Sequence, residues 1–268
     1  MANEPIKCFS QHLLALVGTY VTADESVRDQ YAKYGVPPSA ERIHFVYSGV
    51  PVIHDDKWYV LTAGHSIAPY VDAIAKQQIF STGVSLVDSL GTDDPVSPAF
   101  PFEIKDNFDF AIDEPEIGLD YAMLRLSQNH VDLIKTNVVT PLKMELSDSG
   151  GLLLDRNHVA MGFPTEKTDL LSVNPGGIND IYLKPYSVPI LRNNNDDCEF
   201  PRFVGRIKNM DNLDSIVGIS GGPIFCFSDD GKRYTIAAVQ SRWDPKTKTV
   251  YATEISSIIR HFSARNEA

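Results

Sequence analysis

The stretch Gly218-Ile219-Ser220-Gly221-Gly222-Pro223 decides how the rest of the chain is interpreted. It places a serine between small residues, and the apolar run Ile224-Phe225-Cys226-Phe227 follows at once. Glycines let a backbone bend sharply and let another molecule approach closely, so the pattern predicts a tight turn that feeds a buried strand. A serine at such a turn can present its hydroxyl beside converging amide N–H groups, as a nucleophile and an oxyanion hole require. Taken alone, the stretch indicates no more than a glycine-rich β-turn.

Two further segments carry the other groups that such a serine needs. Leu61-Thr62-Ala63-Gly64-His65-Ser66 ends the strand-like segment Lys57-Trp58-Tyr59-Val60, and Asp120-Tyr121-Ala122-Met123-Leu124-Arg125-Leu126 follows later. With the serine stretch, they resemble the T-A-[AG]-H, D-x-A-x-L and G-x-S-G-G-P segments of the chymotrypsin/trypsin-like serine peptidases. The order His, Asp, Ser is also the one found in chymotrypsin. The resemblance extends from about Ser48 to Ile255 and is closer to single-domain bacterial trypsin-like peptidases than to disulfide-rich digestive enzymes.

The resemblance implies a fold, an activity and a set of site residues. The implied fold is all-β, with two antiparallel Greek-key β-barrels, an N-terminal helical extension and a C-terminal helix. The implied activity is that of a serine endopeptidase, which hydrolyses peptide bonds of a protein or peptide substrate through an acyl-enzyme without a metal or organic cofactor. His65 would be the general base, Asp120 would orient its imidazole, and Ser220 would be the nucleophile. The backbone N–H groups of Gly218 and Ser220 would form the oxyanion hole.

A second aspartate competes for the carboxylate role. Asp109-Phe110-Ala111-Ile112 also fits the D-x-A-x pattern, but Asp113-Glu114-Pro115-Glu116 predicts a break in the strand that follows. After Asp120, Ala122, Leu124 and Leu126 alternate toward one face, as expected of a half-buried strand. The sequence therefore favours Asp120 and keeps Asp109 as the alternative.

One position departs from the zymogen-activated members of the family. Those members carry an aspartate directly before the serine, which pairs with a new N-terminal ammonium after cleavage, whereas this chain has Ile219. No Ile-Val-Gly-Gly-type activation site is found either. We therefore expect other contacts to hold the active conformation, or a regulatory protein partner to switch it.

Two residues, Asp214 and Arg242, are the candidates for setting the cleavage preference. Asp214 stands six residues before Ser220, where trypsin-like enzymes place the aspartate that binds Arg or Lys side chains. The alternative is that Asp214 is a surface residue in a turn. Gln240-Ser241-Arg242 corresponds to the segment that pairs with bound peptide, and Arg242 could occlude the pocket or pair with Asp214.

Patterns along the chain suggest three parts. Residues 1–40 read as a helical extension, because Ile6, Phe9, Leu13 and Val17 recur at helical spacing and Asp24 could cap a second helix. Residues 41–148 would form the first barrel with His65 and Asp120. Residues 149–268 would form the second barrel with Ser220 and end in a helix, and the small, polar segment Ser147-Asp148-Ser149-Gly150-Gly151 marks the boundary.

Composition excludes several classes of function. The net charge of −11 argues against a nucleic-acid partner, because phosphate contacts need a basic surface. No apolar run reaches the length of a membrane span, and the apolar segment Leu13-Leu14-Ala15-Leu16-Val17 is short for a signal peptide. Three cysteines without metal-ligand spacing point to a reducing compartment, so we expect a cytoplasmic, bacterial protein.

Two other functions share the same motifs. A binding module could keep the fold without catalysis, and an esterase or acyltransferase could use the same scaffold. The G-x-S-x-G elbow of α/β-hydrolases is not matched, because Ser220 lies in G-x-S-G-G-P and the histidine precedes the acid in the chain. The peptidase interpretation is favoured because all three motifs occur in order.

Overall fold

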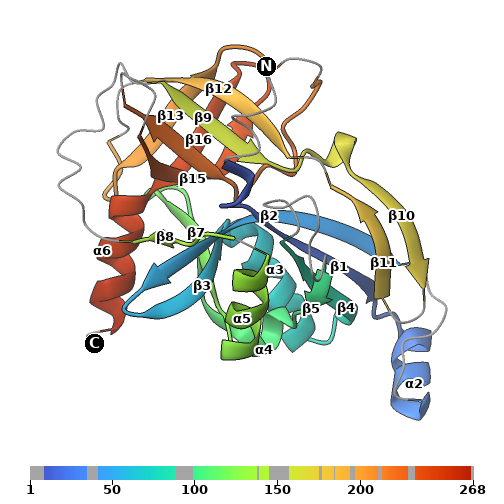
Figure 1. Cartoon of the computed structure of the whole chain (residues 1–268). Helices are drawn as coiled ribbons and strands as arrows, with labels where there is room; N and C mark the ends of the chain where they lie inside the picture. Colours follow the sequence, from blue (N-terminus) through green and yellow to red (C-terminus); the bar gives the residue numbers. More distant parts are fainter. Residues whose placement is uncertain are drawn as a thin grey trace.

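The structure, a computed structural model, describes residues 9–34, 42–88, 99–137, 139–144, 157–174, 177–183, 185–193, 197–210, 213–228 and 233–266. In these residues most of the regular structure is β-strand, and the strands form two main units joined along one face (Figure 1).

The N-terminal unit is an 8-stranded sheet. Its strands are β1 (Leu14–Thr22), β2 (Ile43–His54), β3 (Lys57–Thr62), β4 (Ile79–Val87), β5 (Ala99–Pro101), β6 (Phe108–Glu114), β7 (Leu119–Arg125) and β8 (Leu142–Lys143). They lie in the order β5-β4-β1-β2-β3-β7-β6, and β8 pairs with β2. Among these strands only β8 pairs in parallel. The sheet wraps around one apolar core to which β1, β2, β3, β4, β5 and β7 all contribute buried side chains.

The C-terminal unit is a closed antiparallel barrel. Its strands are β9 (His158–Gly162), β12 (Tyr186–Arg192), β13 (Arg202–Ile207), β14 (Pro223–Phe227), β15 (Tyr234–Asp244) and β16 (Thr249–Glu254). They close in the order β12-β13-β16-β15-β14-β9, and β10 (Asp169–Asn174) and β11 (Gly177–Tyr182) form a separate hairpin. The predicted all-β class with two antiparallel units is confirmed: the second unit is a closed barrel, and the first is an 8-stranded sheet.

Five helices lie around the strands of the described residues. They are α2 (Glu25–Tyr34), α3 (Gly64–Ala75), α4 (Ile104–Asn107), α5 (Gln128–Thr136) and α6 (Ile255–Asn266). The predicted C-terminal helix is confirmed as α6, which leaves the barrel and packs Ile258 and Phe262 beside Tyr59 of the first sheet (Figure 1). The chain end therefore ties the two units together. None of the described helices is long and apolar enough to cross a bilayer.

The N-terminal segment corrects one prediction. The helix expected from the spacing of Ile6, Phe9, Leu13 and Val17 is wrong from Leu14 onward, because Leu14–Thr22 is strand β1 and pairs with β2 and β4. The helical spacing was coincidental, because the apolar run is continuous and is buried on both faces, as in a central strand. These residues belong to the first sheet and not to a helical extension of residues 1–40. The second helix is present as α2, and the Val27 N–H donates to Asp24 Oδ1 at 2.8 Å as the predicted cap.

A hairpin delivers the candidate histidine to the junction between the two units. β2 and β3 pair from Val50–Leu61 to His54–Lys57, and the turn residues Asp55 and Asp56 have φ values of 47° and 59°. Two consecutive positive φ values are typical of a type I′ turn, whose twist matches the paired strands. β3 ends at Thr62, and α3 begins at Gly64. The predicted domain boundary at residues 147–151 lies outside the described residues.

Candidate active site

His65 and Asp120 lie together at the junction of the two β units. His65 Nδ1 lies 2.7 Å from Asp120 Oδ2, and the His65 backbone N–H donates to Asp120 Oδ1 at 2.9 Å. The Asp120 side chain is 3% exposed and the His65 side chain 28% exposed. The buried carboxylate of Asp120 thus fixes Nδ1 of the ring. The opposite edge of the imidazole, which carries Nε2, faces the exposed side of the site.

Gly64 lets the histidine come this close to the aspartate strand. A Cβ on Gly64 would lie 1.8 Å from the backbone oxygen of Ile112 and 2.9 Å from the nitrogen of Tyr121. Both atoms belong to backbone that cannot move aside, so only glycine fits at the first position of α3. The Gly-His pair of the T-A-G-H motif is therefore explained by close packing of α3 on β6 and β7.

Thr253 anchors the aspartate from the other unit. The Asp120 backbone N–H donates to Thr253 Oγ1 at 2.9 Å, and Thr253 Oγ1 lies 3.2 Å from the Asp120 carbonyl oxygen. Thr253 is on β16 of the barrel and is 1% exposed. The position of the carboxylate thus depends on contact between the two β units.

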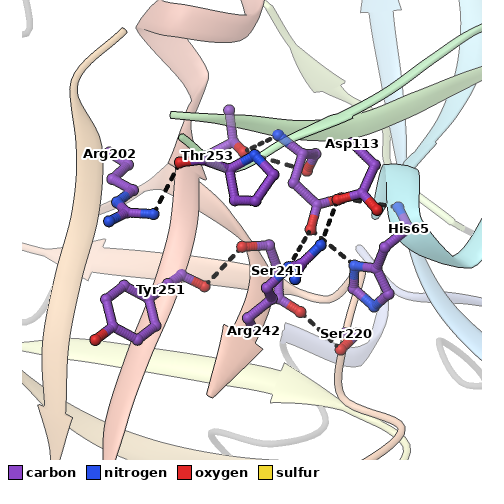
Figure 2. A network of polar contacts seen from close by, with 10 residues as sticks. His65, Asp113, Arg202, Ser220, Ser241, Arg242, Tyr251 and Thr253 are labelled. Carbon is purple, nitrogen blue, oxygen red and sulfur yellow. Dashed lines mark hydrogen bonds and ion pairs between the residues drawn. The ribbon is translucent and has the colours of Figure 1, made fainter. Parts of the chain in front are cut away.

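Ser220 lies in the turn before β14. Its hydroxyl donates to the carbonyl oxygen of Ser241 at 2.9 Å (Figure 2). Gly218 and Gly221 flank it with φ values of 97° and 86°, in the left-handed region that favours glycine. Between them Ile219 is fully buried in the barrel core and fixes the turn.

Two carbonyl groups of the turn, those of Val217 and Ile219, accept hydrogen bonds, whereas the N–H groups of Gly218 and Ser220 donate none among the described residues. Thr165 N donates to Val217 O at 2.8 Å, and Gly222 N donates to Ile219 O at 2.8 Å. In a trans peptide the N–H points opposite to the C=O, so these bonds fix the directions of the Gly218 and Ser220 N–H groups. Among the described residues neither N–H has an acceptor. Two unused donors on either side of Ile219 are what a developing oxyanion needs.

Ser48 on β2 holds the turn from the first sheet. Its hydroxyl donates to the Gly218 carbonyl oxygen at 2.9 Å and accepts from the Phe163 N–H at 3.0 Å. Ile219 is buried, so a carboxylate at this position would need a partner. Here the position carries no charge, and the hydrogen bond from Ser48 of the first sheet holds the adjoining Gly218 peptide.

Figure 2 shows the His65 ring and Ser220 on the same side of the polar network. Within the described part of the chain no hydrogen bond joins the Ser220 hydroxyl to the His65 ring, because that hydroxyl points to Ser241. Catalytic hydrogen bonds of this kind often tighten only when substrate binds. His65, Gly218 and Ser220 line one cavity of about 570 Å³.

Arg242 does not pair with Asp214. Its guanidinium donates to Asp113 Oδ1, and its Nε lies 3.7 Å from Asp120 Oδ2 (Figure 2). The same Asp120 oxygen accepts from His65, so Arg242 is a neighbour of the His65–Asp120 pair. The alternative in which Arg242 pairs with Asp214 is therefore wrong.

Asp214 lies at the surface. Its side chain is exposed, its backbone N–H donates to Glu166 Oε1 at 3.1 Å, and it lines neither of the cavities that border His65, Asp120 and Ser220. The interpretation of Asp214 as the base of a buried specificity pocket is therefore wrong, and the alternative of a surface turn residue holds. Asp214 has the expected spacing of six residues from Ser220, but the loop turns its side chain toward solvent.

Asp109 lies apart from the imidazole. Its carboxylate is 3.7 Å from Arg265 Nη1, on the side of β6 near α6. The predicted break after Asp109 falls inside the expected segment, because β6 ends at Glu114, just before Pro115, although Asp113 itself still pairs with Asp120. The preference for Asp120 agrees with the geometry.

Several residues of this site carry no sequence signal. Ser48, Thr165 and Thr253 act through partners more than 45 positions away along the chain. A lone Ser or Thr in a strand does not reveal such a partner. Among the described residues no group of three or more His, Cys, Asp or Glu side chains is placed to hold a metal ion.

Comparisons with known proteins give similarity at the level of structure only. No protein-family model matches the chain, and no curated protein matches it. The thermostable serine protease AL20 from an extremophilic microorganism is 13% identical with a TM-score of 0.48, and the alignment covers 94% of each chain. The active form of the Rv3671c protease from M. tuberculosis is 14% identical with a TM-score of 0.48, covering 98% of this chain and 84% of that one. The protease Anisep from Arthrobacter nicotinovorans is 16% identical with a TM-score of 0.43, covering 91% and 90%.

Proposed function

We propose that the protein is a serine endopeptidase that cleaves peptide bonds through a Ser220 acyl-enzyme. The observation that carries the proposal is the meeting of three features at one cavity. A buried aspartate orients His65, Ser220 lies in a tight turn beside the same cavity, and two backbone N–H groups of that turn have no acceptor in the described chain.

The proposed reaction uses each of these features in turn. His65 Nε2 takes the hydroxyl proton as Ser220 Oγ attacks the scissile carbonyl carbon, and the carbonyl electron pair moves onto oxygen. The Gly218 and Ser220 N–H groups stabilise that oxyanion. As it collapses, the C–N bond breaks and the imidazolium gives its proton to the leaving amine. Water then attacks the Ser220 ester through the same steps, with His65 again as the base, and releases the acid and free Ser220.

Asp120 contributes by orientation and charge. Because Oδ2 accepts from Nδ1, the proton of neutral His65 stays on that nitrogen and the other nitrogen is the base. The 3% exposure of the carboxylate strengthens its stabilisation of the imidazolium, since a low-dielectric surrounding screens the two charges little. In the proposed reaction the imidazolium forms as Ser220 attacks, so this interaction acts mainly on the transition state.

The proposed enzyme needs no N-terminal cleavage for competence. Ile219 is buried in the barrel core and offers no carboxylate to a freed amine, and Ser48 and Thr165 already hold the turn. The intact chain is therefore expected to react with serine-directed reagents.

The test is labelling of the intact purified protein with an aryl fluorophosphonate, followed by peptide mapping. The expected result is one adduct, on Ser220, with Met1 or Ala2 still at the N-terminus. Ser220→Ala should abolish labelling, and the matched control Ser26→Ala, an exposed serine of α2, should not. An unlabelled wild type, or labelling that survives in Ser220→Ala, would overturn the proposal. Hydrolysis of esters without cleavage of denatured casein would replace the peptidase by an esterase on the same site.

A further inference from the structure

The cavity beside Ser220 lies on the side where the leaving part of a substrate must sit. Its lining includes His65 and Ser66 at the start of α3, Gly218 and Ser220. In the proposed reaction His65 gives its proton to the leaving amine, so that amine must lie within hydrogen-bonding reach of the imidazole. The chain that follows the scissile bond therefore starts at the mouth of this cavity.

A second, smaller cavity lies on the other side of the site. It has a volume of about 300 Å³ and is lined by Asp120, Ser241, Arg242, Arg202 and Tyr251, among others, but not by His65 or Ser220. Figure 2 shows Arg202 and Tyr251 beyond Ser241 and Arg242 as seen from Ser220. The two cavities have no described lining residue in common, and the acyl part of a substrate would follow the β15 side.

The walls of the larger cavity are mainly apolar and aromatic. Four consecutive residues of β2 contribute to it, His44, Phe45, Val46 and Tyr47, and the Phe45 and Tyr47 rings stack with centroids 4.7 Å apart. Val217 lies at its edge and is 57% exposed, among the most exposed large apolar side chains of the described residues. An apolar side chain left in water beside a candidate nucleophile is suited to cover an apolar ligand.

The cavity also lacks fixed charge. None of its described lining residues is Asp, Glu, Lys or Arg. Burial, followed by the influence of Tyr20 and Tyr70, raises the pKa of Tyr47 to about 12, so this phenol stays neutral at any ordinary pH. A charged substrate side chain would lose its water here and gain no counter-ion, whereas an apolar side chain loses nothing.

We infer that this cavity selects the leaving-group side of the substrate: it binds a large apolar or aromatic side chain carried by one of the first two residues after the scissile bond. The inference rests on the proposed function and adds the substrate class. A cavity of about 570 Å³ lies within the range of ligand sites and exceeds the space that one aromatic side chain needs. Cleavage preference is then set mainly after the bond, and Asp214, which lies outside the cavity, has no part in it.

Acyl transfer tests this side of the site separately from the rest. An acyl-enzyme formed from a fixed methyl ester reacts either with water, giving the acid, or with an added amine, giving a new amide. In the second case the amine nitrogen attacks the acyl carbon, its proton passes through His65 to Ser220 Oγ, and the ester bond breaks. Because this is the reverse of the acylation step, the amine occupies the leaving-group position. The ratio of amide to acid therefore measures binding there.

The expected ratios differ strongly among amines. Phe-amide or Gly-Phe-amide should give at least about tenfold more transfer than Gly-Gly-amide at equal concentration, since even one methylene in an apolar pocket changes selectivity by about tenfold or more. Asp-amide should give the least. Transfer to all of these amines within twofold of Gly-Gly-amide would overturn the inference. Acid release in that same reaction would show that the acyl-enzyme still forms, so the proposed function would stand.

A charge at the edge of the cavity gives a second readout. Val217→Asp should lower transfer to the aromatic amines at least tenfold and raise transfer to Lys-amide, a gain that general damage to the protein would not produce. The matched control is Leu191→Asp on β12, which also replaces an exposed apolar side chain (47% exposed) but lies outside the cavity lining. Its ratios should equal those of the wild type. Identical ratios in Val217→Asp would contradict the inference, and a wild type that forms no acyl-enzyme would remove the proposed function and the inference together.

Discussion

The two halves of the candidate site are held in opposite ways. His65 and Asp120 are joined by two hydrogen bonds, and Thr253 of the barrel fixes the Asp120 backbone within a buried junction. Ser220 instead lies in an open turn between two positive-φ glycines, and among the described residues its hydroxyl bonds only to Ser241. The first half is part of the packing between the β units, whereas the second is a loop attached to it.

This difference predicts which residues can be changed without loss of stability. Removing a buried acceptor from the His65–Asp120 half leaves unpaired donors in the junction and should cost stability as well as activity. Changes at the Ser220 hydroxyl should cost activity alone. Variants in the two halves should therefore differ in stability as well as in turnover.

Ser220→Ala should show the largest loss of turnover, of about 10⁶-fold, with an unchanged melting temperature. The physical reason is that the nucleophile is lost, while within the described residues the hydroxyl gives up a single hydrogen bond, to the Ser241 carbonyl of β15. Turnover of a quenched peptide and thermal unfolding by circular dichroism measure the two quantities. Adding His65→Ala to Ser220→Ala should cause little further loss, since the two act as a unit; a multiplied loss would mean that they act independently.

Asp120→Asn should lower turnover by about 10⁴-fold and should also lower the melting temperature. The backbone N–H and the ring Nδ1–H of His65 bond to different oxygens of Asp120, and in asparagine one of these becomes an NH2 group, so one of the two donors loses its acceptor. The matched control is Asp109→Asn, which removes a half-exposed pairing with Arg265 worth about 1 kcal/mol or less. If Asp109→Asn were the more damaging change, the carboxylate role would move to Asp109.

Gly218→Ala should lower kcat by about 10²–10³-fold, with little change in KM. A Cβ there would lie 2.5 Å from the Phe163 carbonyl oxygen, and a φ of 97° is strained for alanine, so the peptide must rotate and withdraw its N–H from the site. The N–H is needed most when the oxyanion forms, hence the effect on kcat. An equal rise in KM, with kcat unchanged, would show that Gly218 serves ground-state binding only.

Thr253→Val should have the smallest effect on turnover and a clear effect on stability, of about 1–3 kcal/mol. The change keeps the shape of the side chain but leaves the Asp120 N–H without its acceptor in a buried place. Chemical denaturation measures it, with Thr247→Val in an exposed turn as the control expected to change stability by about 0.5 kcal/mol or less. Equal stability of the two variants would show that the junction does not hold Asp120.

The sequence predicts the parts of the molecule that are encoded locally. The motifs around His65, Asp120 and Ser220 each place a reactive side chain at the end of a strand or in a glycine turn, and all three recur at one junction in the structure. Sequence patterns do not predict a contact whose two residues lie far apart along the chain. Ser48 and Thr253 look like ordinary strand residues, because their acceptors and donors lie 170 and 133 positions away.

The two main errors have the same physical origin. Ile6, Phe9, Leu13 and Val17 fit a helical period, and only the pairing of Leu14–Thr22 with β2 and β4 decides for a strand. Asp214 has the expected spacing from Ser220, but the spacing does not say whether the side chain turns inward, and the structure turns it to solvent. Local propensity is overridden by tertiary contacts in the first case, and loop conformation decides the second.

The central claim, that Ser220 carries the acyl group during peptide-bond cleavage, is tested most directly by trapping that intermediate. The wild type is mixed with a peptide ester, quenched in acid within milliseconds, and analysed by mass spectrometry of the intact chain and of its peptides. We expect an added mass equal to the acyl group on the peptide that contains Ser220, and no such mass in His65→Ala. Substrate turnover with no covalent adduct, or with the adduct on another residue, would contradict it.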